Sequence, residues 1–529
     1  MRILIIGDLT SIHTYNFIKY TAKSFSETEI VACSPAGLEI KEEYLSFYEK
    51  EHITIVQQDN RFLGEYENLI FCYLSIKDMG QFDVCHIHYL SRFEVFLGRL
   101  VAKQCKLIIA NYWGSDWLRI SDAERQWQKK QLHISDYIVT DSKQIYMQLE
   151  DYYNGEYNDK IRYIRFKLPI LEYIKSSLGA EEMTSFKRKY KIPDDKIVVV
   201  CGYNAVKAHK HLEMIRALEK LNIEEKQKIF AIFPMTYGKD FTYMEMVRRQ
   251  LDRAAFGYLI LEDFMKIHEI ASLRRCTDVF MLMRTSDAYS STIIEYTYCN
   301  TVIINGKWLD YSELEKAGAF YEKVEGVEGI TEKLSYILRN MEGERERFKR
   351  NREAVKLFQE EYDKNKLWEE LYLSTPVTRK EKNNINESVL LKEASVYFNK
   401  ITSRNILIMD VLYRMAGMKN IEETINDWIA AWKVKVIGIY GAGRLGDIVY
   451  GKVYNPQIEK IIMFDRNSQQ GSSGSSELLS PEDVYHNEMD VLIITPVLEM
   501  DQIKTQYENR IKARVLTIEE WLSKLERLG

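Results

Sequence analysis

The sequence predicts an α/β protein in which two doubly wound parallel sheets follow one another, with a third, smaller α/β domain after them. Short β-rich runs alternate with helical patterns from Arg2 to about Ile164, and the alternation begins again after the loop at Pro193. A third β-α-β segment starts at Val434. Such alternation is typical of a parallel sheet covered by helices. The 529 residues also exceed what one hydrophobic core organises.

The first two sheets can be traced through their apolar runs. The strands expected in an N-terminal domain, residues 1–165, read RILIIG, EIVAC, ITIV, DVCHIH, KLIIA, YIVT and IRYI. Those expected in a second domain, residues 166–373, read KIVVVCG, KIFAIFP, GYLIL, TDVFMLM and TVIING. Amphipathic stretches between the runs predict the covering helices.

The remaining chain divides into a connecting segment and a third domain. Residues 374–386 lack any apolar period, which predicts a linker, and two helical patterns complete the segment 374–432. The third domain is expected over residues 433–529. Its GSSGSS run, Gly471 to Ser476, predicts a flexible loop inside the domain.

Composition excludes several classes of function. Lys and Arg total 73 against 78 Asp and Glu, so no global basic field attracts a nucleic-acid backbone. No stretch approaches the roughly 18 apolar residues that a membrane span needs. The seven Cys are odd in number and lack CxxC spacing, which predicts reduced thiols in a cytoplasmic protein.

Polar residues follow three strands of the first sheet, where ligands of parallel sheets bind. A hydroxyl nucleophile needs a general base there, and Asp116, His13 and His88 are the available groups, with Asp116 favoured. The alternative is that Asp116 only caps a helix and that His86 or His88 is a core residue. A metal site from these two histidines is disfavoured because no Cys or Glu partner is apparent.

In the second domain, one loop suits a diphosphate. The segment Gly202 to His211 lies between a buried strand and a helix, whose amide groups and positive dipole end attract anions. A second loop, Pro234 to Gly238, also ends a strand at a glycine. The candidate donor-binding residues of these two loops are Gly202, Asn204, Lys207, Lys210, Thr236 and Tyr237.

A third loop of the second domain carries a candidate ribose ligand. A Ser or Thr at 290–292 is expected to cap a helix and to place Glu295 in its first turn. Glu295 either accepts vicinal ribose hydroxyls or is only half of a capping box. The candidate residues here are Arg284, Asp287, Ser290, Ser291, Thr292 and Glu295.

These residues resemble a known family. Two tandem Rossmann-like domains with Gly202 and Asp287-x7-Glu295 look like the GT-B glycosyltransferases, whose donor loop carries an acidic-x7-Glu signature. Over residues 1–350, segments such as GYNAVKAHKHL resemble bacterial N-acetylfucosaminyl (acetamido-dideoxyhexosyl) transferases of surface-polysaccharide assembly. The resemblance implies two domains that face a cleft and a nucleoside-diphosphate sugar as donor. Asp287 replaces the usual Glu and Trp113 a frequent histidine, which leaves a retaining or inverting outcome open.

The chain contains no Asp-x-Asp pair, so the sequence predicts a transferase that needs neither metal nor cofactor. The charge of the leaving group would be met by Lys207, Lys210, Arg284 and helix-start amides.

The third domain contains a dinucleotide-type fingerprint. GxGxxG follows a strand and precedes a helix, with an acidic residue at the end of the next strand; the candidate nucleotide-binding residues are Gly441, Gly443, Gly446 and Asp465. The glycines can instead serve only the turn and the packing. The domain resembles the small nucleotide-sugar-binding Rossmann-like domains of bacterial polysaccharide enzymes.

Together these observations predict a cytoplasmic hexosyltransferase that acts on a glycan or lipid-linked acceptor and binds no nucleic acid. Peripheral contact with the inner face of the membrane and homo-oligomerisation stay open. Two rival functions remain. One is an NAD-dependent or nucleotide-sugar-modifying enzyme centred on the third domain, and the other is a non-catalytic glycan-binding protein.

Overall fold

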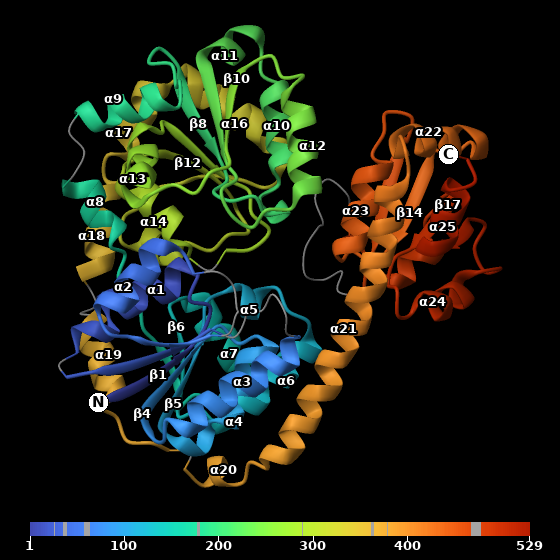
Figure 1. The fold of residues 1–529 in the computed structure, drawn as a ribbon. Coiled ribbons are helices and arrows are strands. Elements are labelled where there is room, and N and C mark those ends of the chain that lie inside the picture. Colours follow the sequence, from blue (N-terminus) through green and yellow to red (C-terminus); the bar gives the residue numbers. More distant parts are fainter. Residues whose placement is uncertain are drawn as a thin grey trace. The chain divides into compact units, whose positions relative to one another are not determined.

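The computed structural model describes residues 1–25, 27–34, 40–57, 64–176, 180–287, 289–360, 364–377, 379–466 and 478–528. Three parallel sheets, each flanked by helices, account for most of this part of the chain (Figure 1). The predicted α/β class is therefore confirmed. The expected loop Gly471 to Ser476 lies outside the described residues.

The first sheet has the strand order β3-β2-β1-β4-β5-β6-β7 within the described residues. Its strands are β1 (Arg2–Ile6), β2 (Glu29–Cys33), β3 (Thr54–Val56), β4 (Phe82–His88), β5 (Cys105–Tyr112), β6 (Tyr137–Thr140) and β7 (Ile161–Tyr163). Its helices are α1 (Ile12–Tyr20), α2 (Glu42–Lys50), α3 (Glu65–Asp78), α4 (Arg92–Leu100), α5 (Ser115–Leu118), α6 (Asp122–Ile134) and α7 (Lys143–Tyr152).

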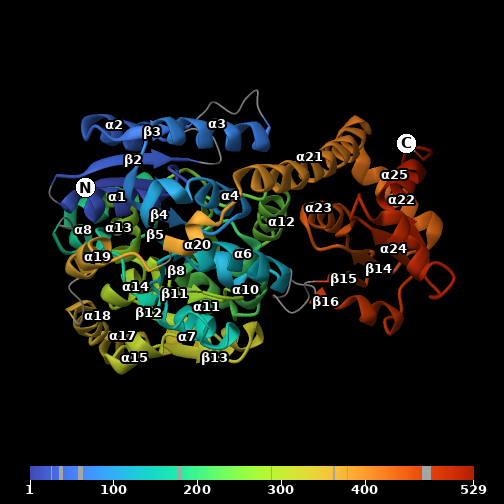
Figure 2. The ribbon, with the colours of Figure 1, turned by 90° about the horizontal axis from the view of Figure 1, so that it is seen from below.

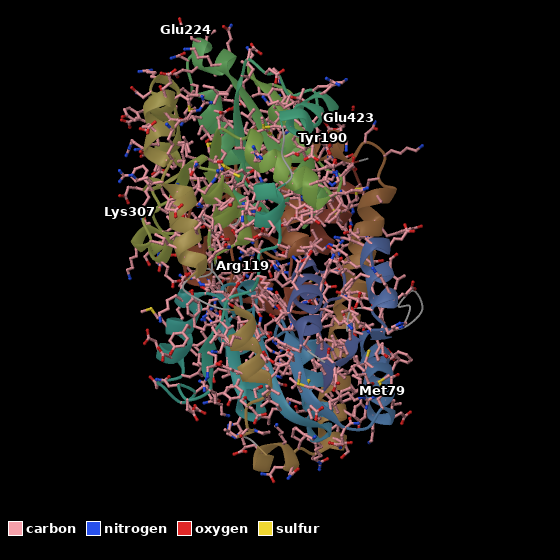
Figure 3. The ribbon with its side chains drawn as sticks, turned by 90° about the vertical axis from the view of Figure 1, so that its left-hand side faces the viewer. Met79, Arg119, Tyr190, Glu224, Lys307 and Glu423 are labelled. Atoms are coloured by element: carbon pink, nitrogen blue, oxygen red, sulfur yellow. The ribbon has the colours of Figure 1, made fainter. Side chains whose placement is uncertain are left out.

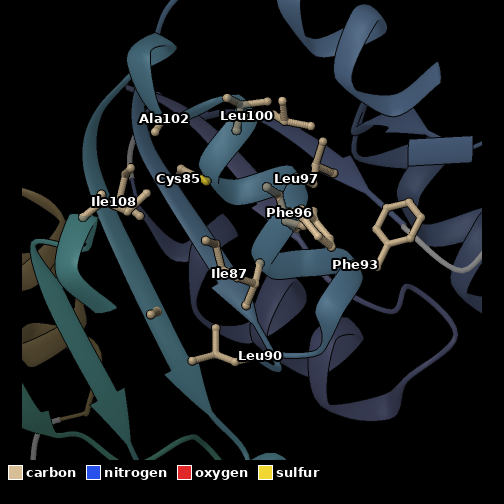
Figure 4. Close-up of a cluster of buried hydrophobic side chains, with 14 of the residues drawn as sticks. Cys85, Ile87, Leu90, Phe93, Phe96, Leu97, Leu100, Ala102 and Ile108 are labelled. Carbon is tan, nitrogen blue, oxygen red and sulfur yellow. The ribbon is translucent and has the colours of Figure 1, made fainter. Parts of the chain in front are cut away.

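Both faces of the first sheet are buried, which is why its strands read as nearly continuous apolar runs. On one face Phe96, Leu97 and Leu100 of α4 pack over Cys85 and Ile87 of β4 (Figure 4). The opposite face packs against α1, α2 and the later helix α19 (Lys364–Tyr372). Its cluster includes Ile3, Ile5, Phe17, Tyr44, Tyr48, Trp368 and Tyr372.

The segment expected as a linker belongs structurally to the N-terminal domain. The first compact unit comprises Met1–Pro169, Ala288–Ser291 and Leu357–Thr402. Lys382 Nζ of α20 (Arg379–Asn383) lies 2.6 Å from Oδ2 of Asp136, which lies in the turn between α6 and β6, and both side chains are buried. This buried ion pair ties residues 374–386 to the first sheet although the segment has no apolar period.

The second sheet has the order β10-β9-β8-β11-β12-β13, again among the described residues. Its strands are β8 (Ile197–Cys201), β9 (Ile229–Pro234), β10 (Gly257–Leu261), β11 (Val279–Leu282), β12 (Val302–Gly306) and β13 (Glu322–Val324). Its helices are α8 (Ile170–Ser176), α9 (Ala180–Lys189), α10 (His211–Glu219), α11 (Ile223–Lys228), α12 (Phe241–Leu251), α13 (Ile267–Cys276), α14 (Ser291–Tyr298), α15 (Ser312–Lys316), α16 (Ile330–Arg339), α17 (Met341–Phe348) and α18 (Asn351–Glu360).

The third sheet, of order β16-β15-β14-β17-β18 in the described chain, shares the second compact unit with the second sheet. Its strands are β14 (Val436–Tyr440), β15 (Lys460–Phe464), β16 (Leu478–Leu479), β17 (Val491–Ile494) and β18 (Arg514–Thr517). The associated helices are α22 (Ile421–Trp432), α23 (Arg444–Val453), α24 (Met500–Tyr507) and α25 (Ile518–Leu525), together with the part of α21 (Glu387–Gly417) that begins at Ser403.

The surface is polar and the cysteines are unpaired. Charged side chains such as Glu224, Lys307 and Glu423 project outward (Figure 3). All seven cysteines are free thiols, and Cys299 alone among them is not fully buried. Within the described part of the chain, none of the helices combines the length and the apolar character needed to cross a bilayer.

In each sheet the order in which strands are added reverses beside the first strand, between β1 and β4, β8 and β11, and β14 and β17. At such a reversal the loops after the two strands run to opposite sides and leave room for a ligand. The topology therefore selects three strand-end regions as candidate sites.

In the third domain, the glycines of the fingerprint differ in what surrounds them. A Cβ added at Gly446 would lie 1.8 Å from the carbonyl oxygen of Gly441, whereas one added at Gly443 would meet nothing within 4 Å. Gly446 is thus required for the approach of α23 to the strand-end loop.

We expect Gly446→Ser to destabilise the third domain by at least about 1–3 kcal/mol, as overpacking of a tight contact does. Gly443→Ser, the matched control, should be nearly neutral because serine is a favoured N-cap residue. Hydrogen–deuterium exchange of the β14 and β15 amides measures both effects. Equal protection in the two variants would contradict the role of Gly446.

Candidate active site

The first candidate region lies at the carboxyl ends of β1, β4 and β5. His88 ends β4 and is paired in register with Asn111 of β5, so both side chains lie on the same face of the sheet. A Cβ added at Gly7, directly after β1, would lie 2.8 Å from the Cβ of His88. Glycine at position 7 is what allows His88 to approach the end of β1.

His86 and His88 both belong to this buried face. Their rings are 4.2 Å apart, and Phe17 packs edge-on against both. His86 Nδ1 forms a 2.7 Å hydrogen bond with the Tyr372 hydroxyl. Burial lowers the pKa of His88 to about 3 and that of His86 well below its usual value, so both rings are neutral near pH 7.

Asp116 is held by backbone amides. Its carboxylate accepts hydrogen bonds from the N–H groups of Leu90 at 3.1 Å, Trp113 at 3.0 Å and Gly114 at 2.8 Å. The side chain is 1% exposed, and burial raises its pKa to about 6 against the opposing effect of these bonds. The contacts give Asp116 a structural role, because it joins the loops after β4 and β5.

His13 is the exposed member of the predicted catalytic set. It lies in the first turn of α1, whose N-cap Ser11 accepts a hydrogen bond from the His13 amide. Its ring centroid is 4.8 Å from that of the half-buried Trp113, and Trp113 stacks on Phe166 at 4.2 Å. The structure brings His13, Trp113 and His88 together at one strand-end region; sequence reasoning did not single out Phe166.

The second candidate region lies between β8 and β11. Gly202 follows β8 with a φ of +68°, and an added Cβ would lie 2.9 Å from His211 Nε2. The next loop contacts it, because the Ala205 amide donates to the carbonyl oxygen of Tyr237 at 2.9 Å. Asn204 Oδ1 accepts from the Val206 amide at 2.9 Å and shapes the turn.

The two lysines of this loop do not converge. A 3₁₀ turn, Lys207–His209, precedes α10, and Lys210 adopts a left-handed conformation between them. Lys207 Nζ lies 2.7 Å from Asp447 Oδ1 of the third domain. Lys210 Nζ lies 4.8 Å from the centroid of the Trp308 ring. Each ammonium therefore has its own partner.

Asp287 lies in a buried polar network. It is 3% exposed and accepts hydrogen bonds from the hydroxyls of Tyr203 at 3.1 Å and Tyr311 at 2.9 Å. Arg284 Nη1 lies 3.3 Å from the same carboxylate and also contacts Tyr203. Arg284 and Asp287 are thus brought together, with two tyrosines that sequence reasoning missed.

Glu295 occupies a different position from the one predicted. Ser290 precedes α14, and Ser291 and Thr292 are its first two residues. Glu295 therefore lies in the second turn, beyond the position that a capping box requires. Its Oε2 accepts from Arg274 Nε at 2.7 Å, and both side chains are at least nine-tenths buried. Arg274 also donates to the Tyr296 hydroxyl at 3.0 Å. Nothing in the sequence marked Arg274 as the partner.

The third candidate region is the glycine loop that follows β14. Gly441 follows β14 with a φ of +100°, and its amide donates to the Phe464 carbonyl oxygen. Asp465 Oδ2 accepts from the Ala442 amide at 2.8 Å, so the acidic residue after β15 supports the glycine loop itself. Across the described residues, no three His, Cys, Asp or Glu side chains gather as metal ligands would.

Neither family models nor curated proteins match the sequence. Among solved structures, a glycosyltransferase from Rickettsia africae covers 71% of this chain and 99% of its own, with 14% identity and a TM-score of 0.55. Anabaena Alr3699/HepE in complex with UDP and glucose covers 70% and 98%, with 12% identity and a TM-score of 0.56. The Thermosynechococcus elongatus sucrose-phosphate synthase covers 70% and 96%, with 12% identity and a TM-score of 0.51.

At such low identity these similarities bear on the fold alone. The chain has the Rossmann-like α/β fold of the GT-B glycosyltransferases.

Proposed function

We propose that this protein is a glycosyltransferase that moves a sugar from a nucleoside-diphosphate sugar to a glycan or lipid-linked acceptor in bacterial surface-polysaccharide synthesis. The observation that carries the proposal is the pair of buried carboxylates, Asp287 and Glu295, in the segment that follows β11, each beside its own arginine. The structural likeness to HepE in complex with UDP and glucose supports a UDP-sugar as the donor.

The donor would bind along the loops after β8, β9 and β11. Backbone amides near Ser291 and at the start of α10 suit the diphosphate, because helix N-termini attract anions. Glu295 would accept the ribose hydroxyls through the carboxylate capacity that Arg274 leaves unused, since an ionised carboxylate has about four acceptor sites. Arg284 would stabilise the negative charge that develops on the leaving group.

Glu295→Gln should weaken UDP binding by roughly tenfold or more, because a hydrogen bond to a charged group contributes about 1.5–3 kcal/mol. Isothermal titration calorimetry measures the change. Glu262→Gln is the matched control, because Glu262 pairs with Arg248 on a half-exposed surface of the same domain. Unchanged affinity in a folded Glu295→Gln variant would contradict the ribose role.

We propose that His13 is the general base that takes the proton from the acceptor hydroxyl. Asp116 is buried and held by three backbone donors, and His88 is a buried neutral ring, whereas His13 is exposed beside Trp113. A general base must reach the proton that it abstracts. Asp116 and His88 would then shape the region rather than contact the acceptor hydroxyl.

His13→Gln should lower kcat by about 10²-fold or more while leaving UDP affinity unchanged, since positioned proton transfer contributes about 10²–10⁴-fold. Steady-state kinetics with a UDP-sugar separates the two quantities. The control His52→Gln changes an exposed histidine at the end of α2, in the same domain. An unaltered kcat for His13→Gln would assign the proton to another group.

We propose that transfer requires no metal ion, because the sequence lacks an Asp-x-Asp pair that would hold one at the diphosphate. Transfer should therefore persist in excess EDTA. Complete loss of activity that manganese restores would reject this part of the proposal. A radiolabelled or coupled UDP-release assay measures both conditions.

Nucleotide binding by the third domain stays a prediction, as do membrane contact and self-association. A lipid-linked acceptor would bring the protein to the membrane surface without a spanning segment.

A further inference from the structure

The third domain packs directly on the donor-binding domain inside the second compact unit. Helices α12 and α23 lie side by side (Figure 2). Gly451 of α23 lies against α12, because an added Cβ would lie 2.3 Å from Thr242 Cγ2 and 3.7 Å from Met246 Sδ. Met246 also packs against the hydrophobic core of the third domain. This α12–α23 contact is therefore an apolar, close-packed interface.

Polar contacts border the α12–α23 contact. Arg249 Nη2 lies 2.8 Å from Glu422 Oε1, and Arg216 Nη2 donates to the Tyr454 hydroxyl at 3.2 Å. Arg249 and Glu422 are each more than half exposed, so their ion pair contributes little to the stability of the interface. Its value is to fix how the two domains face each other.

One polar contact at this interface involves the donor loop itself. Lys207 Nζ lies 2.7 Å from Asp447 Oδ1 and 5.0 Å from the centroid of the Tyr450 ring. Asp447 lies in the first turn of α23, the helix that opens after the glycine loop of the third domain. The two side chains are only 15% and 25% exposed, so solvent screens this pair less than the outer one.

We propose that the third domain restrains the donor site. Asp447 holds the Lys207 ammonium, which the diphosphate of the donor needs. Packing of α23 against α12 and binding of the donor therefore compete. This inference rests on the proposed function, since it assigns a regulator to the same site.

The competition follows from charge and burial. A diphosphate at the Gly202 loop brings negative charge towards a carboxylate, and the two anions repel each other. If Lys207 turns to the diphosphate, Asp447 is left largely buried without its cation, which is unfavourable. Because coupling between two binding events is reciprocal, a bound donor would weaken the docking of the third domain by the same factor.

The test measures binding of UDP and of inorganic pyrophosphate to the full-length protein by calorimetry. Asp447→Asn keeps the shape but removes the charge, and it should tighten binding of both ligands by about three- to tenfold, the range of a competing partly buried ion pair. Glu459→Gln is the control, because it makes the same change in net charge at an exposed pair with Lys435 inside the third domain. It should leave both affinities unchanged.

A double-mutant cycle assigns the effect to Lys207. Lys207→Met should weaken binding, and adding Asp447→Asn to it should then give a clearly smaller gain, because only the direct repulsion between the carboxylate and the diphosphate remains to be removed. A gain of the same size with and without Lys207 would overturn the proposal. So would equal affinity of Asp447→Asn and the unaltered protein.

A second variant tests docking without touching either charge. Gly451→Leu should force α12 and α23 apart and also tighten UDP binding, whereas Gly343→Leu, in a helix where an added Cβ meets nothing within 4 Å, should not. Weaker UDP binding in Gly451→Leu would show that the third domain supports the donor loop, and would overturn the proposal. If UDP and pyrophosphate bind to no form of the protein, the proposed function itself fails, together with this inference.

Discussion

Burial of both faces of each parallel sheet is the constraint on which the rest of the structure depends. Parallel strands need helices on both faces, so polar backbone groups become accessible only at the strand ends. In all three sheets of the described chain, the strand order reverses beside the first strand. Gly7, Gly202 and Gly441 each follow that first strand directly. The candidate chemistry is confined to these edges because the remaining surface of each sheet is covered.

The same constraint explains why residues far along the chain return to the first sheet. Trp368 and Tyr372 fill the face that α1 and α2 leave incomplete, and Tyr372 supplies the hydrogen-bond partner of His86. The buried Lys382–Asp136 pair then fixes the segment that follows. Breaking such a pair leaves a buried charge without its partner, which is costly, so the segment is held although it is polar.

In the segment that follows β11, buried ion pairs take the place of apolar packing. Arg274–Glu295 and Arg284–Asp287 hold carboxylates in defined positions before any ligand binds. Such preorganisation lowers the cost of orienting groups when a charged substrate arrives. The contact between Lys207 and Asp447 differs from them, because it joins the loop after β8 to the third domain and its side chains are partly exposed.

The sequence by itself determined the three parallel sheets, their order along the chain and the glycine turns at their edges, because alternating apolar runs and local turn chemistry are short-range signals. It also located His13, Gly202 and Asp287 at strand ends. Only the tertiary structure decided which side chains meet there. Arg274 and Glu295 are 21 residues apart, Lys207 and Asp447 are 240 apart, and Lys382 and Asp136 are 246 apart. No periodicity encodes such pairs, because packing selects the partners, and packing also makes Asp116 a buried acceptor of backbone hydrogen bonds.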